Sequence, residues 1–288
     1  MDFITWGRSP WDQLVPNHAS WTLAWVALGA GLVFLIGHAV YVMMRPAPPP
    51  DPAQLAAARE LAARVPARVL RHSLGARLFH WIMAAAMIVL LVTAFLPMAG
   101  VTFSWVLIHW VAGLVLTASI LYHVVHASVV LDFWSIWPTR EEYGEQVIRF
   151  RRAVGQTLPP PRKFGKYPFE NKMYHLAIIA TGLAATATGL FMLKRVPTGF
   201  LERNPYVFGD VTWGAIYVLH GFAGLALITL TIVHVYFAVR PEKRPVTLSM
   251  LSGWTSREDY LDHHDPQRWA VAVEPPQPST PDRPQIVG

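Results

Sequence analysis

The sequence predicts an all-α integral membrane protein, a four-helix transmembrane bundle with one extra N-terminal transmembrane helix. The first observation is composition: 53% of the 288 residues are hydrophobic and only 15% are charged. The second is the length of five apolar stretches, each sufficient to cross a bilayer core of about 30 Å. We expect the spans at residues 20–43, 77–98, 104–131, 172–193 and 212–239.

The first span is interpreted as a retained membrane anchor. One Arg and two Asp precede it, whereas a cleaved signal peptide begins with a basic segment and has an apolar region of about 7–15 residues. RPAPPPDP at 45–52 predicts a stiff linker after this span. From there to residue 70 we expect either a short amphipathic helix on the membrane surface or a solvated connector.

The basic residues predict the orientation of the spans. Lys and Arg number six in 44–79, eight in 132–172 and six from Arg240 onward, against four in the remaining connections. Because basic residues concentrate on cytoplasmic loops, we expect a periplasmic N-terminus and a cytoplasmic C-terminus in a bacterial inner membrane. The proline-rich end of the tail is expected to be disordered.

The chain contains no cysteine. A disulfide framework, a thiolate iron–sulfur site and a CxxCH site for covalent haem attachment are therefore excluded. The sequence also shows no glycine-rich phosphate loop and no nucleophile–base motif. We predict no catalytic residue, and any haem would be a non-covalent haem b.

Four histidines on two spans are the strongest functional signal. His109 and His123 lie on the third span, His220 and His234 on the fifth, and each pair is separated by 14 residues. Fourteen steps return a side chain to nearly the same helix face, about 21 Å along the axis. Two such helices would hold two stacked b haems, and His109 and His220 are the two candidates for the outer one.

The inner haem site is ambiguous from the residues alone. His234 is one expected ligand, and its partner is either His123 or His80, which opens the second span at equal depth. A third inner haem between His123 and His175 is a further alternative. Other histidines of the spans are expected to form hydrogen bonds, contact haem propionates or carry protons: His38, His126 and His175. Histidines in polar flanks are expected at the surface: His72, His263 and His264.

Several motifs resemble those of a known family. They are RLFHW opening the second span, LIHWVAG opening the third, GKYPFENK before the fourth, and LHGFAG and IVHVYFA on the fifth. With SGWTSREDYLDHHDPQRW in the tail, the resemblance covers about residues 76–270. The chain is similar here to the formate dehydrogenase gamma subunit family, the membrane dihaem cytochrome b, whose relatives anchor hydrogenases and thiosulfate reductases.

The resemblance implies the haem ligands and the domains. His80 with His234 would hold the inner haem iron, and His109 with His220 the outer one, while His123 stays an alternative inner ligand. Combined with the predicted spans and charges, the resemblance gives four segments in chain order: a periplasmic N-terminus with the first transmembrane helix at 1–44, a cytoplasmic linker at 45–75, a dihaem cytochrome b bundle at 76–240 and a cytoplasmic tail at 241–288.

The resemblance also implies a quinone pocket beside the inner haem. The family's turn there reads GKYNAGQK, and four of its eight positions agree with GKYPFENK here. Glu170 and Asn171 differ from it, and with His175 they would supply a donor for a quinone carbonyl and a proton path. The alternative is that Glu170 and Asn171 only cap the fourth predicted helix.

We therefore expect a membrane cytochrome b subunit of a respiratory oxidoreductase complex, with no substrate chemistry of its own apart from quinone reduction or oxidation. It would pass electrons between a periplasmic iron–sulfur or cytochrome c subunit, which serves a catalytic subunit, and the quinone pool. The alternatives are a quinol-oxidising subunit feeding a periplasmic reductase, and a haem-free anchor or transporter. The placement of basic charge argues against a nucleic acid partner.

Overall fold

The computed structural model describes residues 2–44, 62 and 64–271. Within these residues, five helices are long and apolar enough to cross a membrane, which confirms the predicted fold class. They are α1 (Trp21–Met44), α3 (Leu74–Met98), α4 (Trp105–Val129), α6 (Phe169–Met192, continued by η2, Leu193–Arg195) and α7 (Asp210–Val239). Most of the segment considered for a surface helix, and the end of the tail predicted to be disordered, lie outside the described residues.

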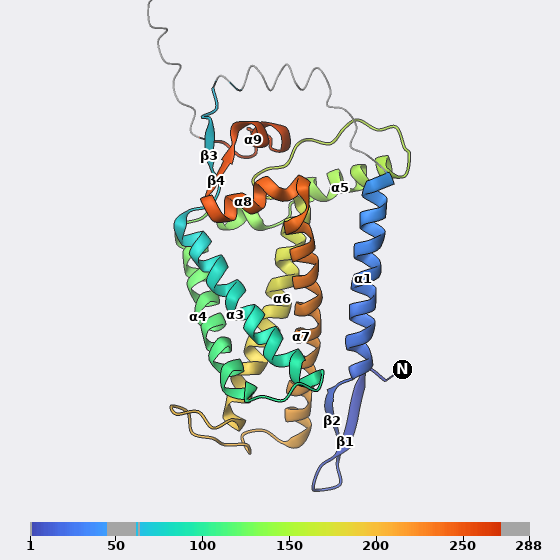
Figure 1. Cartoon of the computed structure of the whole chain (residues 1–288), viewed down its shortest axis with the longest axis vertical. Helices are drawn as coiled ribbons and strands as arrows, with labels where there is room; N and C mark the ends of the chain where they lie inside the picture. Colours follow the sequence, from blue (N-terminus) through green and yellow to red (C-terminus); the bar gives the residue numbers. More distant parts are fainter. Residues whose placement is uncertain (1, 45–61, 63, 272–288) are drawn as a thin grey trace, which may run out of the picture.

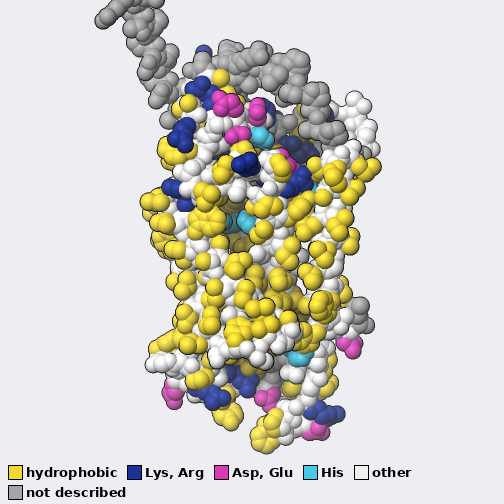
Figure 2. All heavy atoms as spheres, in the orientation of Figure 1, with side chains coloured by type: hydrophobic (Ala, Val, Ile, Leu, Met, Phe, Trp, Pro, Cys, Tyr) yellow, Lys and Arg dark blue, Asp and Glu magenta, His cyan; other side chains and the backbone are white. Residues whose placement is uncertain are grey.

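The four-helix bundle consists of two helix pairs (Figure 1). Helix α3 packs along α4, and α6 packs along α7, whereas the two pairs approach each other less closely through α4–α6 and α3–α7 contacts. Helix α1 stands at the edge of the bundle and contacts α7. Figure 2 shows a band of hydrophobic side chains around the helices, with the charged side chains gathered toward its two ends. A bilayer would cover this band.

One end of the bundle, which we call the hairpin end, carries an element that the sequence did not predict. Strand β1 (Ile4–Arg8) pairs antiparallel with β2 (Leu14–Ala19), and β2 lies on the first turns of α7. Gly214 permits this contact, because a Cβ there would lie 1.9 Å from the Pro16 carbonyl oxygen. Because Gly214 has no side chain, the hairpin is able to pack against α7. This contact holds the start of α1 against the bundle.

The opposite end, which we call the α9 end, is covered by a layer of short elements. The layer contains η1 (Phe133–Ile136), α5 (Arg140–Ala153), η3 (Pro241–Lys243), α8 (Arg244–Ser252), a two-stranded sheet of β3 (Arg68–Leu70) and β4 (Trp254–Ser256), and α9 (Arg257–His263). Its core holds Val65, Val69, Tyr260 and Leu261. The end of the predicted linker is thus folded onto the predicted tail.

A glycine joins this layer to the start of α3. Gly253 ends α8 with a φ of +91°, a conformation that other residues adopt at a cost. Its carbonyl oxygen accepts hydrogen bonds from the backbone N–H groups of Arg71 (2.8 Å) and His72 (3.0 Å). Arg71 and His72 are therefore held directly above the first turn of α3.

We predict that Gly214→Ala releases the hairpin from α7. The added methyl group must displace the Pro16 backbone, and overpacking of this kind costs about 1–3 kcal/mol. The control is Gly224→Ala on the same helix, where a Cβ meets nothing within 4 Å among the described residues. Tryptic cleavage after Arg8 should accelerate in Gly214→Ala alone; equal cleavage in both variants would contradict this packing.

Candidate functional site

Two histidines face each other near the hairpin end. His109 on α4 and His220 on α7 have ring centroids 6.3 Å apart and ring planes at 70°. Gly189 on α6 leaves room for this arrangement, because a Cβ there would lie 3.4 Å from Cε1 of His220. We call these two residues the hairpin-end pair, and the structure brings them together as the sequence predicted.

Two threonines determine which ring nitrogen of this pair is free. Thr93 Oγ1 donates to the carbonyl of Val89 at 2.7 Å and lies 2.8 Å from Nδ1 of His109. Thr188 Oγ1 lies 2.9 Å from Nδ1 of His220 and likewise donates within its own helix. Because each hydroxyl proton is already donated, each oxygen accepts from Nδ1–H. Both Nε2 atoms are therefore unprotonated, the form that binds a metal.

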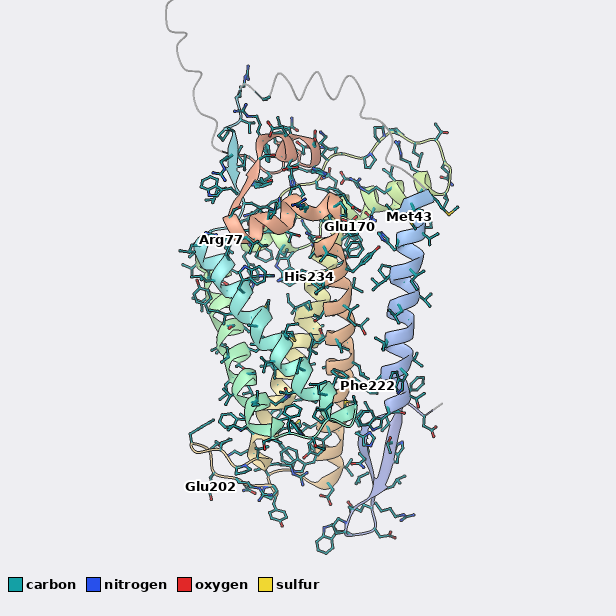
Figure 3. The ribbon with its side chains drawn as sticks, in the orientation of Figure 1. Met43, Arg77, Glu170, Glu202, Phe222 and His234 are labelled. Atoms are coloured by element: carbon teal, nitrogen blue, oxygen red, sulfur yellow. The ribbon has the colours of Figure 1, made fainter. Side chains whose placement is uncertain are left out.

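A second pair lies near the α9 end, between α3 and α7. His80 on α3 and His234 on α7 have ring centroids 6.3 Å apart; Figure 3 shows His234 directed into the space between the helix pairs. The Tyr174 ring stacks on His234 with centroids 5.3 Å apart, and its hydroxyl donates to the carbonyl of Leu230. We call His80 and His234 the α9-end pair.

The alternative inner ligand, His123, faces a different partner. Its ring centroid lies 6.2 Å from that of His175 on α6, and we call these two residues the third pair. His123 is thus not directed at His234, the partner that the spacing of the histidines offered. All three pairs of the described chain connect one helix pair with the other.

The three separations fit two imidazoles that share one metal ion. A metal–imidazole bond is about 2 Å long and the ring centre lies about 1 Å behind the nitrogen, so the centroids of two axial imidazoles lie about 6 Å apart. The described residues contain no group of three or more His, Cys, Asp or Glu that would hold a bare ion. Paired imidazoles without further ligands suit a haem, since the porphyrin supplies the other four.

A cluster of basic side chains lies beside the α9-end pair. Arg71 is only 4% exposed, and it donates to Nε2 of His264 (3.0 Å) and to the carbonyl of Lys166 (3.0 Å). Among the described residues, the buried Nε atoms of Arg71 and Arg77 have no hydrogen-bond partner. Burial, with the charges of Arg71 and Lys166 next, lowers the pKa of His72 to about 3. This cationic cluster favours a bound anion.

The expectation that His264 lies at the surface is wrong. His264 is buried between Tyr260 and Trp269, and its Nδ1–H donates to the Gly165 carbonyl at 2.6 Å while Nε2 accepts from Arg71. The cause is the folded layer at the α9 end, which the polar sequence around His264 did not indicate. His38 likewise has a specific place, because its Nδ1 contacts Tyr236 Oη and Arg240 Nη1 and so joins α1 to α7.

The residues proposed for a quinone pocket are only partly together. Glu170 and Asn171 are exposed at the start of α6, and Figure 3 shows Glu170 beside the α5 layer. Asn171 lies one helical turn from His175 and shares its face. The capping alternative is wrong in detail, because the N-cap is Pro168 and no side-chain cap bond is present there among the described residues.

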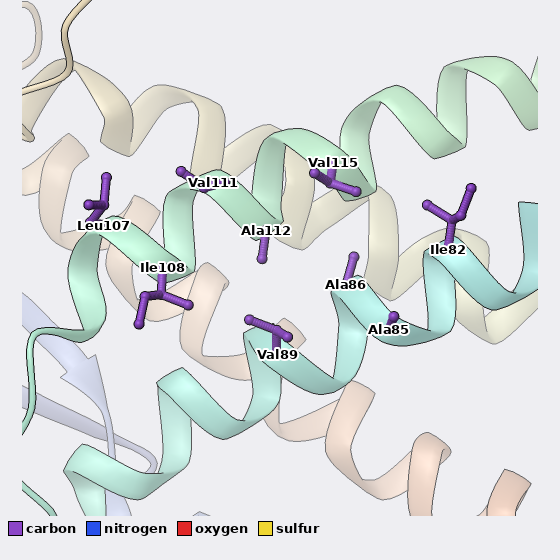
Figure 4. Close-up of a pocket in the computed structure, with 9 residues that line it drawn as sticks. All are labelled: Ile82, Ala85, Ala86, Val89, Leu107, Ile108, Val111, Ala112 and Val115. Atoms are coloured by element: carbon purple, nitrogen blue, oxygen red, sulfur yellow. The ribbon is translucent and has the colours of Figure 1, made fainter.

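An apolar groove of about 550 Å³ runs between α3 and α4 (Figure 4). Small residues, including Ala85, Ala86 and Ala112, leave this space, and its lining holds none of the histidines or the proposed quinone residues. Sequence reasoning offered Arg77 as a partner for propionate charge, and it missed the two threonines and the buried Arg71. A threonine within an apolar span at the depth of a histidine is the signal that would have found the threonines.

A family model for "Prokaryotic cytochrome b561" matches residues 71–253 of the chain, which include both predicted pairs, the third pair and the start of the cationic cluster. A comparison with curated proteins finds no match.

We predict that the α9 end loosens as the pH falls from about 6.5 to about 4. Burial, and next the charge of Arg71, lowers the pKa of His264 to about 4, with smaller contributions from His263 and Lys243. The unfolded segment therefore binds more protons in this range, and stability is lost as the pH falls. Hydrogen exchange of residues 254–264, corrected for intrinsic rates, should rise. His264→Gln should reduce this pH dependence and leave the part that His72 contributes, whereas the exposed His263→Gln should keep all of it.

Proposed function

Because this chain belongs to the prokaryotic cytochrome b561 family, we propose that it holds two b haems, one in the hairpin-end pair and one in the α9-end pair, and passes electrons between them. Family membership and the five candidate spans make the protein a multi-pass membrane cytochrome b of electron transport whose cofactor is haem b. Membership therefore argues against a haem-free anchor or transporter. The assignment to the formate dehydrogenase gamma type remains an expectation from motifs alone.

The equal ring separation in the two pairs carries this proposal. Both measure 6.3 Å between centroids, and both connect the α3–α4 pair with α7. His220 and His234 lie 14 residues apart on α7, which corresponds to about 21 Å along the helix. One site at each end of the hydrophobic band would give electrons a path through most of the bilayer.

The chain's own residues would position the cofactor and tune it. A bound haem b supplies an iron that gains and loses one electron. The imidazoles would hold this iron, Thr93 and Thr188 would orient the hairpin-end rings, and the apolar helix faces would exclude water. Beside the α9-end pair, Arg71 and Arg77 supply positive charge that suits the propionate carboxylates.

We further propose that electrons enter at the hairpin end and reach quinone near the α9 end. Twenty of the 24 Lys and Arg residues lie in the segments assigned to the cytoplasmic side, which supports a periplasmic hairpin and a cytoplasmic α9 end. A periplasmic iron–sulfur or cytochrome c subunit, serving a catalytic subunit, would then be the electron donor. A quinol-oxidising subunit that feeds a periplasmic reductase uses the same parts in reverse.

Asn171 and His175 are the residues that we propose for quinone. They share one face at the start of α6, near the α9-end pair, while Glu170 is directed toward α5 and would act only in proton supply. Binding of a quinone-analogue inhibitor should weaken in Asn171→Leu and stay unchanged in Glu170→Gln. Unchanged binding in Asn171→Leu would place the pocket elsewhere.

Substitution of the paired histidines tests the two haem sites. We expect His109→Ala and His220→Ala each to lose the same haem, and His80→Ala and His234→Ala each to lose the other, as measured by haem content per purified chain. His126→Ala is the matched control, because this histidine stacks on Tyr122 and faces no other imidazole in the described chain. Full haem content in both hairpin-end variants would overturn that site.

The threonine contacts give a finer prediction. Thr93→Val keeps the shape of the side chain but removes the acceptor for Nδ1–H of His109, and loss of such a supporting bond weakens metal binding by about 10–100-fold. Thr93→Ser should retain haem. Competition against a haem-scavenging apoprotein measures the rate of loss, and equal rates for the Val and Ser variants would show that the hydroxyl does not hold the ring.

A further inference from the structure

The third pair has the same geometry as the two pairs already assigned. The ring centroids of His123 and His175 lie 6.2 Å apart, against 6.3 Å in each of the other pairs. The pair also connects one half of the bundle with the other, from α4 to α6. The third pair uses α4 and α6, whereas the α9-end pair uses α3 and α7. It therefore shares no histidine with the other two pairs.

The surroundings of this pair hold the His123 ring in place and, among the described residues, leave one ring nitrogen of His175 without a hydrogen-bond partner. Phe79 lies face to face with His123, with centroids 4.2 Å apart and planes at 6°, so the imidazole is held in one orientation. Nδ1 of His175 is buried and, among the described residues, has no hydrogen-bond partner. His80 of the α9-end pair likewise has a buried Nδ1 with no partner among the described residues, so the two pairs share this feature.

No further protein ligand accompanies the two rings in the described part of the chain, where no group of three or more His, Cys, Asp or Glu is found. A bare zinc or iron ion takes four to six ligands, and two imidazoles would leave it largely uncoordinated. A quinone is also excluded as a bridge, because its two carbonyl oxygens lie further apart than the about 4 Å that remains between the facing nitrogens. A tetrapyrrole needs two axial nitrogens and no other protein ligand.

We propose that His123 and His175 are the axial ligands of a third haem b at the α9 end. This site goes beyond the two-haem function proposed above, and rests on it for the chemistry of paired imidazoles. With His175 bound to this iron, Asn171, one turn away on the same helix face, remains the quinone residue, and a third haem would place a second electron carrier beside it. Reduction of a quinone to a quinol takes two electrons and two protons; the two neighbouring carriers would supply the electrons, and water at the exposed Glu170 would supply the protons.

The haem-to-protein ratio of the purified full-length chain tests this directly and needs no variant. Three haems per chain are expected, and a redox titration should resolve three one-electron components. A ratio of two in preparations that are saturated with haem would overturn the third site. A ratio of zero, or a ratio that stays unchanged in both His109→Ala and His220→Ala, would instead overturn the proposed function.

Variants then identify the ligands. His123→Ala and His175→Ala should each lower the ratio from three to two, and His80→Ala combined with His123→Ala should lower it to one. His126→Ala, one turn from His123 on α4, is the control and should keep three. If the wild-type chain binds two and both His80→Ala and His123→Ala bind one, these histidines serve the same iron and the third site is wrong.

Discussion

The distance between facing imidazoles is the constraint on which this structure depends. Two rings with centroids 6.3 Å apart leave room for one metal between them, and the bundle keeps that distance by splitting into two tight helix pairs. Helices α3 and α4 contact each other extensively, and so do α6 and α7, although Ala86 and Ala112 leave the apolar groove between α3 and α4. The paired histidines project into the space between the two helix pairs, one from each side.

Residues that contact the paired histidines, or lie beside them, decide what these histidines are able to bind. Threonines that donate within their own helices become acceptors for Nδ1–H, and so leave Nε2 unprotonated at the hairpin end. At the α9 end, Arg71 and Arg77 have buried Nε atoms without a hydrogen-bond partner among the described residues, and their charges create a positive environment. The first arrangement suits iron and the second suits carboxylates, and haem b combines both in one molecule.

The sequence predicted the spans well because apolar length is a local property, and every span ends within three residues of its predicted position. It also predicted both proposed pairs, although the choice of His80 over His123 came from family motifs and not from spacing. The hairpin and the α9-end layer were missed. Their contacts, such as Gly214 with Pro16 and Arg71 with His264, join residues about 200 positions apart, and no periodicity records such contacts.

The central claim is that two imidazole nitrogens share each iron. Near-infrared magnetic circular dichroism of the oxidised protein measures it most directly, because the charge-transfer band reports the identity of both axial ligands. The account predicts that all haem iron in the purified chain is low-spin with two imidazole ligands. High-spin iron, an axial ligand other than imidazole, or a fully assembled chain that contains no haem would contradict it.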